Sequence, residues 1–196
     1  MNYAQFVKPL RLPPGFAAPT RLRFEELEAR AISRADLDDD VRGINQSIEL
    51  IQRTRGGGWP TEPVSEAYNY VDLVWHEQEF REQTSFTYAV YDEAGGYVGC
   101  GYLAPVGCRT PLDEQLLDCD VDISWWVTPG AYARGHYTTL YRALHHWAEK
   151  EYPFEAPHYS NREIPPLPPR TQLSRTASTT HDWGRTSVGN PEKEKL

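Results

Sequence analysis

Apolar residues recur at two different spacings along the chain, and the change of spacing separates the predicted elements. In residues 121–127 apolar residues occupy every second position, which predicts a strand. Pro129 and Gly130 follow and end it. From residue 137 the spacing becomes three and four, which predicts an amphipathic helix over 137–148. This part of the chain therefore predicts a strand, a short loop and a helix.

The same two spacings predict the other elements. Ser33 is the expected N-cap of a helix over 34–51, and a second helix is expected over 64–81. The expected apolar face of the second helix consists of Val64, Ala67, Tyr68, Val71, Val74 and Trp75. The predicted order is strand 24–32, helix 34–51, helix 64–81, strand 85–91, strand 97–106, strand 121–127, helix 137–148 and strand 157–161.

Gly135 stands immediately before the helix that follows strand 121–127. The first N–H groups of a helix have no partner inside the helix, and the helix dipole is positive at that end. A helix start at the end of a strand is therefore a predicted anion site, suited to a phosphate or pyrophosphate.

Residues 127–140 resemble the acetyl-CoA-binding motif of the GNAT N-acetyltransferases. Val127 and Pro129 match its Val-x-Pro, and Gly135 falls on its first glycine. Tyr132 stands where the family has Gln or Arg, and Tyr137 where it has Gly or Ala. The order of elements over residues 22–161 is also similar to that family. The resemblance implies an α/β fold with a mixed, mostly antiparallel central sheet flanked by helices.

The resemblance and the composition divide the chain into three parts. Residues 1–21 are rich in proline without any period, and we expect an irregular arm. Residues 22–161 are the expected GNAT-like domain. Residues 162–196 have almost no apolar periodicity, so we expect a disordered tail. The last helix and hairpin of the family have no counterpart in this tail.

The resemblance also implies a co-substrate and the residues that hold it. The co-substrate is acetyl-CoA, whose thioester carbonyl would be polarised by backbone N–H groups of strand 121–127. The implied cofactor-binding residues are Trp126, Val127, Thr128, Ala133, Arg134, Gly135, His136, Tyr137 and Thr138. The side chain of Tyr137 could obstruct the approach of a pyrophosphate or turn away from it.

Candidate catalytic residues follow from the same chemistry. An attacking amine must lose a proton, and Asp120 and Asp122 share a strand face from which either could act as base, with Asp122 the better placed. Tyr159 is the nearest candidate to protonate the leaving thiolate. Trp59, after three glycines, is a candidate acceptor contact. The simpler alternatives are two solvated carboxylates and a glycine-rich helix stop.

Composition narrows the functional classes. The net charge of −8 argues against broad nucleic-acid binding and is compatible with an amine substrate. No apolar run reaches membrane-spanning length, and no cluster has the ligand spacing of a metal site. Three cysteines without a Cys-x-x-Cys pair indicate reduced thiols and a cytoplasmic location.

The leading functional prediction is N-acetyl transfer from acetyl-CoA to a primary amine of a small molecule or peptide. The alternative is a non-catalytic GNAT-like domain that binds a ligand or partner. The departures at Tyr132 and Tyr137 and the missing final helix favour this alternative. The sequence does not identify the acceptor amine or the oligomeric state.

The tail supplies a direct test. We expect residues from about Pro165 onward to be disordered and dispensable for folding, because they offer no apolar stripe to bury. Amide hydrogen exchange should be fast throughout residues 170–190. Strong protection of those amides would contradict the prediction.

Overall fold

The computed structural model describes residues 6–167, and its central element is a six-stranded sheet in the order β1-β2-β3-β4-β5-β6. Neighbouring strands are antiparallel except β5 and β6, which run parallel. This confirms the predicted mixed, mostly antiparallel sheet. The strands are β1 (Arg21–Phe24), β2 (Leu27–Ala31), β3 (Phe86–Asp92), β4 (Tyr97–Ala104), β5 (Val121–Val127) and β6 (Pro157–Tyr159).

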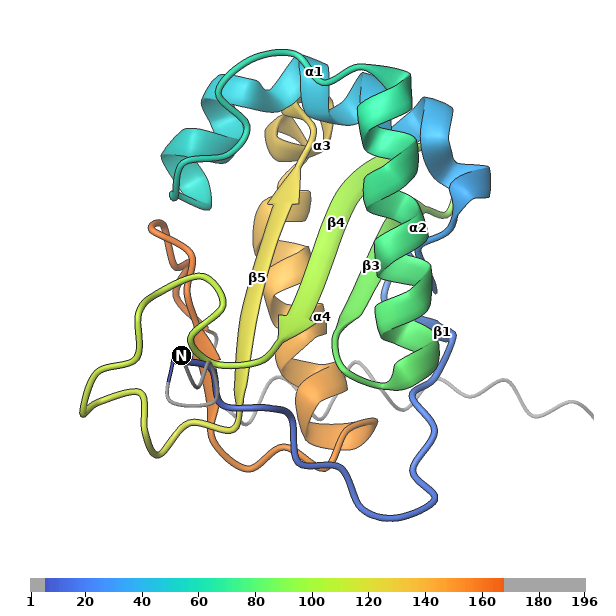
Figure 1. The fold of residues 1–196 in the computed structure, drawn as a ribbon. Helices are drawn as coiled ribbons and strands as arrows, with labels where there is room; N and C mark the ends of the chain where they lie inside the picture. Colours follow the sequence, from blue (N-terminus) through green and yellow to red (C-terminus); the bar gives the residue numbers. More distant parts are fainter. Residues whose placement is uncertain (1–5, 168–196) are drawn as a thin grey trace, which may run out of the picture. The chain divides into compact units, whose positions relative to one another are not determined.

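Helices cover both faces of the sheet (Figure 1). α2 (Glu66–Glu82) lies in front of the strands, and α1 (Leu37–Thr54) crosses near the end of β5. α4 (His136–Lys150) lies behind them. The sheet separates two apolar cores: Trp125 belongs to the core under α4, and Trp126 to the core under α1 and α2. The side chains of successive residues of β5 thus pack on opposite faces of the sheet.

Two local elements differ from the sequence prediction. The single strand expected over 24–32 is a hairpin of β1 and β2, because Glu25 adopts a positive φ of 49° and reverses the chain. The loop expected after β5 contains a short helix, α3 (Pro129–Ala133). The hydroxyl of Thr128 accepts a hydrogen bond from the N–H of Ala131, which starts that helix.

The expected apolar face of α2 is largely exposed, so that prediction is wrong. Tyr68 is 62% exposed and Trp75 is 60% exposed. The fully buried positions on this helix are Asn69, Leu73 and Phe80. Asn69 donates a 2.8 Å hydrogen bond to the buried carboxylate of Asp40 on α1. Tyr97 donates to Oδ1 of Asp40, so Asn69 supplies the partner that the buried Oδ2 would otherwise lack, and that loss would cost more than exposed rings.

The chain after β6 packs against the end of α1. The N–H of Glu163 donates to the carbonyl of Thr54 at 2.9 Å, and the N–H of Arg162 donates to the carbonyl of Arg55 at 3.3 Å. Residues 162 and 163, which begin the expected tail, are therefore held by hydrogen bonds. The expectation of disorder for 168–196 lies outside the described residues.

β4 approaches the end of β5 very closely at Gly99. A Cβ atom at this position would lie 2.1 Å from the carbonyl oxygen of Trp126 and 2.7 Å from Cα of Val127. The φ of Gly99 is also +150°, which side-chain-bearing residues rarely adopt. Only glycine therefore allows β4 to position the C-terminal end of β5.

We expect Gly99→Ala to lower the free energy of unfolding by about 2–4 kcal/mol, because both the clash and the backbone strain must be relieved. Gly58→Ala is the matched control, since no atom lies within 4 Å of its Cβ position. Its effect should stay within about 0.5 kcal/mol. Guanidinium denaturation of the two variants and the native chain measures both values. Equal stabilities would contradict the close approach.

Candidate functional site

The start of α4 is open on the surface. Gly135 is its N-cap, with a φ of 86° and no side-chain cap. Among residues 6–167, no atom lies within 4 Å of the position of a Cβ at Gly135, and Ala133, Arg134 and Thr138 are exposed around it. The helix is 15 residues long, so its dipole is fully developed. The geometry leaves space for an anion at the predicted position.

The basic residue of this segment is tied to its surroundings. Arg134 donates from Nη2 to Oδ2 of Asp92 at 3.1 Å and from Nε to Nε2 of His136 at 3.2 Å. Arg134 is still half exposed, whereas His136 is buried. The side chains of Trp126 and Val127 are fully buried, so these two residues could meet a ligand only through their backbone.

Tyr137 turns inward, away from the open helix start. It is only 5% exposed, and its ring packs against those of Trp125 and Tyr132. Its hydroxyl donates to the carbonyl of Glu163 at 2.6 Å and accepts from Nδ2 of Asn161 at 2.8 Å. The ring therefore does not cover Gly135. It occupies the space between β5 and the chain that follows β6.

Asn161 closes the free edge of β5. Its Oδ1 accepts from the N–H of Trp125 at 3.1 Å, and its Nδ2 donates to the carbonyl of the same residue at 2.9 Å. A side-chain amide carries one acceptor and two donors, so it can pair with a strand as a peptide group does. In the sequence, Asn161 is expected only as the end of a strand over 157–161, and its pairing with β5 is not predicted. An asparagine two positions after a short edge strand is the signal that could have indicated it.

The open start of α4 and the free edge of β5 differ in how well they suit acetyl-CoA. The helix start is exposed and suits a phosphate group. At the strand edge, the N–H of Trp125 is already donated to Asn161, so it is not free to polarise a thioester carbonyl. Part of a bound acetyl-CoA could pair with this strand edge only after Asn161 has released the backbone of Trp125.

Asp122, the preferred candidate base, is 1% exposed. Its Oδ1 accepts a short hydrogen bond from the hydroxyl of Ser160, and its Oδ2 is buried with no partner in the described part of the chain. Burial raises the pKa of this carboxyl, and the bond from Ser160 and the charge of Arg109 oppose that rise. A buried carboxylate with one unpaired oxygen has the capacity to accept a proton.

The other two candidates have different surroundings. Asp120 accepts from the N–H groups of Glu155 and Ala156 at 2.6 and 3.1 Å, so it caps the turn before β6. Tyr159 stacks on His145 with ring centroids 3.9 Å apart, and its hydroxyl is buried without a partner. Burial raises the pKa of that hydroxyl. Tyr159 packs with the core under α4, whereas Asp122 lies on the opposite face of the sheet.

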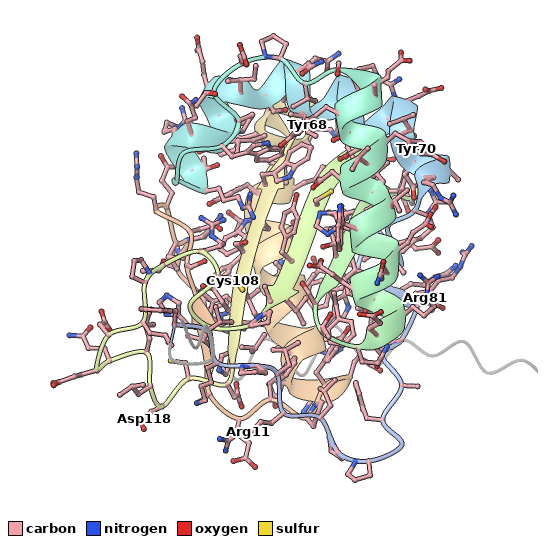
Figure 2. The ribbon with its side chains drawn as sticks, viewed as in Figure 1. Arg11, Tyr68, Tyr70, Arg81, Cys108 and Asp118 are labelled. Carbon is pink, nitrogen blue, oxygen red and sulfur yellow. The ribbon has the colours of Figure 1, made fainter. Side chains whose placement is uncertain are left out.

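A cavity of about 390 Å³ lies over the sheet face that α2 covers, and we call it the α2 cavity. Trp59, the predicted acceptor contact, lines it together with Tyr68 of α2 and Cys108 of the loop after β4. Figure 2 labels Tyr68 and Cys108 on this side of the molecule. Trp59 reaches the cavity because the glycines that end α1 turn the chain back beside Arg55.

One wall of the α2 cavity carries an ion cluster from α2. His76 lies 3.4 Å from a carboxylate oxygen of Asp72 and 3.2 Å from one of Glu79. Burial alone would lower the pKa of His76, but its bonds to the two carboxylates outweigh this and raise the pKa to about 9. His76 is therefore protonated at neutral pH, and the cluster has a net charge of −1.

No metal site or membrane-spanning helix is seen in residues 6–167. Within that range no group of three or more His, Cys, Asp or Glu side chains is arranged to hold a metal ion. None of the helices there is both long and apolar enough to cross a bilayer.

Comparison with solved structures identifies the fold. A ribosomal-protein-S5-alanine acetyltransferase from Vibrio fischeri superposes with a TM-score of 0.51 and 10% identity, covering 67% of this chain and 68% of that one. A Vibrio cholerae protein, provisionally assigned as a ribosomal-protein-serine acetyltransferase, gives 0.51 and 11%, covering 69% and 70%. No protein-family model and no curated sequence matches the chain. The fold is that of the GNAT acetyltransferases, as the sequence motif predicts.

The pairing of His76 predicts a pH dependence of stability. The folded pKa of about 9 exceeds the ordinary value of 6.5, so the stabilisation is complete below about pH 6.5 and is lost as pH rises through 9. We expect the native chain to be more stable than His76→Gln at pH 6. This difference in the free energy of unfolding should shrink by about 2 kcal/mol at pH 10. Urea denaturation at both pH values measures this. A pH-independent difference would exclude the proposed charge pairing.

Proposed function

We propose that this chain is an acetyl-CoA-dependent N-acetyltransferase that modifies a primary amine of a small molecule or peptide. The observation that carries the proposal is the open start of α4 at Gly135, placed directly after β5 in a GNAT fold. The names of the two superposed proteins, both acetyltransferases, support the same reaction class. The α2 cavity, on the other side of the sheet from α4, is the proposed acceptor site.

Residues of this chain would have distinct parts in the reaction. Acetyl-CoA would supply an activated acetyl group, which passes to the amine nitrogen as the carbon–sulfur bond breaks. The exposed backbone around Gly135 would hold its phosphates. Asp122 is proposed as the group that takes the amine proton, because burial and an unpaired oxygen favour protonation there. Trp59 would contact the acceptor from the cavity wall.

The proton for the leaving thiolate is proposed to come from Tyr159, whose hydroxyl has no other partner within the described residues. Asp122 and Tyr159 lie on opposite faces of the sheet. The attacking nitrogen and the leaving sulfur are bonded to the same carbon during the transfer, so both protons move at one reaction centre. Tyr159 would therefore have to turn toward the face of Asp122 to take part. Asp120 is the weaker base candidate because it is less buried than Asp122 and because two backbone N–H groups bond to its Oδ2, which favours the charged form.

A second candidate function is favoured by one specific observation. Asn161 occupies both backbone groups of Trp125 at the strand edge, and Tyr137 fills the space beside it. If this closure is permanent, the domain binds a ligand in the α2 cavity without catalysing transfer. The two functions differ in whether acetyl-CoA binds at all.

Isothermal titration with acetyl-CoA tests the proposal through a matched pair of variants. The left-handed backbone of Gly135 can be adopted by Asn and Asp, which have almost the same size. We expect saturable binding to the native chain and to Gly135→Asn, and a loss of at least about tenfold in affinity for Gly135→Asp, whose charge would repel phosphate. Equal binding to both variants would mean that the helix start is not the phosphate site.

Asn161→Ser separates the two candidate functions. This change shortens the side chain so that it no longer reaches both backbone groups of Trp125. If only Asn161→Ser binds acetyl-CoA, the native edge is closed and must open for transfer. If neither the native chain nor Asn161→Ser binds it, the transferase proposal fails and the non-catalytic function replaces it. Thermal melts of both proteins show whether the variant has kept its fold.

A further inference from the structure

Two arginines that have no carboxylate partner within the described residues share one wall of the α2 cavity. Arg55 ends α1, and Arg109 follows β4. None of the arginine–carboxylate pairs within residues 6–167 includes either guanidinium group. Guanidinium groups remain charged at neutral pH, so this wall carries two positive charges in a partly desolvated position.

Arg55 is fixed in place by contacts that leave its charge uncompensated. Its guanidinium carbon lies 4.3 Å from the centroid of the Tyr102 ring, and its Nε and Nη2 both lie 3.3 Å from the hydroxyl oxygen of Ser124. Burial lowers its pKa. A rigid cation held by a ring and a neutral hydroxyl can still take an anion.

Arg109 lies against Arg55 and has a donor to spare. Its Nη2 donates to the carbonyl of Arg55 at 3.2 Å, whereas its Nε is buried and has no hydrogen-bond partner among residues 6–167. Burial, together with the like charge of Arg55, lowers the pKa of Arg109 to about 10. A ligand carboxylate beside the two groups would relieve the repulsion between them.

Asp122 does not fill this position. It is the carboxylate whose charge acts on both arginines, but one of its oxygens pairs with Ser160 and neither forms an ion pair with a guanidinium group. Asp122 therefore reduces the positive charge behind the wall without satisfying its donors.

The opposite charge lies elsewhere in the same cavity, on α2. The cluster of Asp72, His76 and Glu79 has a net charge of −1 with His76 protonated, and all three residues line the cavity. Asp72 and Glu79 are also partly exposed, at 47% and 41% of their side chains, so a ligand can reach them. The cavity thus has a positive wall and a negative wall, with the rings of Trp59 and Tyr68 beside them.

We propose that the α2 cavity binds a zwitterionic amino acid with an apolar side chain, its carboxylate between Arg55 and Arg109 and its ammonium group toward Asp72 and Glu79. The volume of about 390 Å³ suits a ligand of this size, and the rings of Trp59 and Tyr68 provide the apolar contact. This inference concerns binding alone and does not make that amino acid the acceptor, because its ammonium group would lie on the wall away from Asp122. The binding is tested without any acyl donor.

Three related probes test the two walls separately. L-phenylalanine carries both charges, 3-phenylpropionate lacks the ammonium group, and phenethylamine lacks the carboxylate. In calorimetric titrations of the full native chain we expect L-phenylalanine to bind at least about tenfold more tightly than either single-charge probe, because each charged wall then has a partner. Absence of saturable L-phenylalanine binding, or equal affinity for all three probes, overturns the inference.

Arg109→Met removes one positive charge at similar side-chain length. It should weaken L-phenylalanine and 3-phenylpropionate by about tenfold and leave phenethylamine unchanged. Arg53→Met is the matched control, since Arg53 pairs with Glu163 and does not line the cavity. A loss of affinity in Arg53→Met equal to that in Arg109→Met overturns the assignment of the positive wall.

Alkylation of Cys108 gives a second readout that does not depend on binding heat. Cys108 is exposed and lines the cavity, whereas Cys100 is buried. Saturating L-phenylalanine should slow iodoacetamide modification of Cys108, measured by peptide mass spectrometry, in the native chain and in Arg53→Met but not in Arg109→Met. An unchanged rate in the native chain overturns the site.

If acetyl-CoA binds while L-phenylalanine does not, only this inference fails. The reverse result rejects the transferase proposal alone.

Discussion

The pairing between the side chain of Asn161 and the backbone of Trp125 organises the functional half of the molecule. β6 is only three residues long, so its parallel ladder ends beside Ile123 while β5 continues to Val127. The peptide groups of Trp125 are buried and would lose hydrogen bonds without a substitute. Asn161 supplies both partners. Glu163 and Tyr137 can then meet, and the chain after β6 reaches the end of α1.

β5 connects two chemically different regions. Residues whose side chains face α4 pack beneath the open helix start, and residues facing α1 and α2 lie under the α2 cavity and its charged walls. Trp125 and Trp126 are both fully buried, on opposite sides, so this strand is held rigidly from both layers. A shift of one residue in its register would exchange the two faces entirely. The close approach of Gly99 to the backbone of Trp126 and Val127 fixes its end.

The sequence was most informative where one physical signal dominated. The alternation in 121–127 and the glycine before α4 predict local structure that is confirmed. Ser33 is confirmed as a cap, but of a 3-10 helix (Arg34–Asp36) that leads into α1, whose own N-cap is Asp36. The GNAT resemblance also predicted the sheet correctly.

Predictions from the sequence failed where the local structure depends on an unusual backbone conformation or on residues far away in the chain. The reversal at Glu25 depends on a backbone conformation that glutamate seldom adopts. The role of Asn161 depends on the early end of the hydrogen-bond ladder between β5 and β6. Tyr137 turns inward because its hydroxyl forms hydrogen bonds with Asn161 and with the carbonyl of Glu163. Arg55 and Arg109 are 54 positions apart, so no local pattern could pair them.

The hydrogen bond from Asn69 to Asp40 has a consequence for the rotation of α2 about its own axis. This helix has apolar residues around most of its circumference, with Val71 and Trp75 in solvent and Leu73 and Phe80 in the core. The apolar contacts alone would therefore favour several rotational settings almost equally. Polar contacts select one of them: Asn69 pairs with Asp40, and Glu77 accepts from the N–H and the guanidinium group of Arg34. The orientation of the negative wall of the α2 cavity, formed by residues of the same helix, is thus fixed by bonds that touch no ligand.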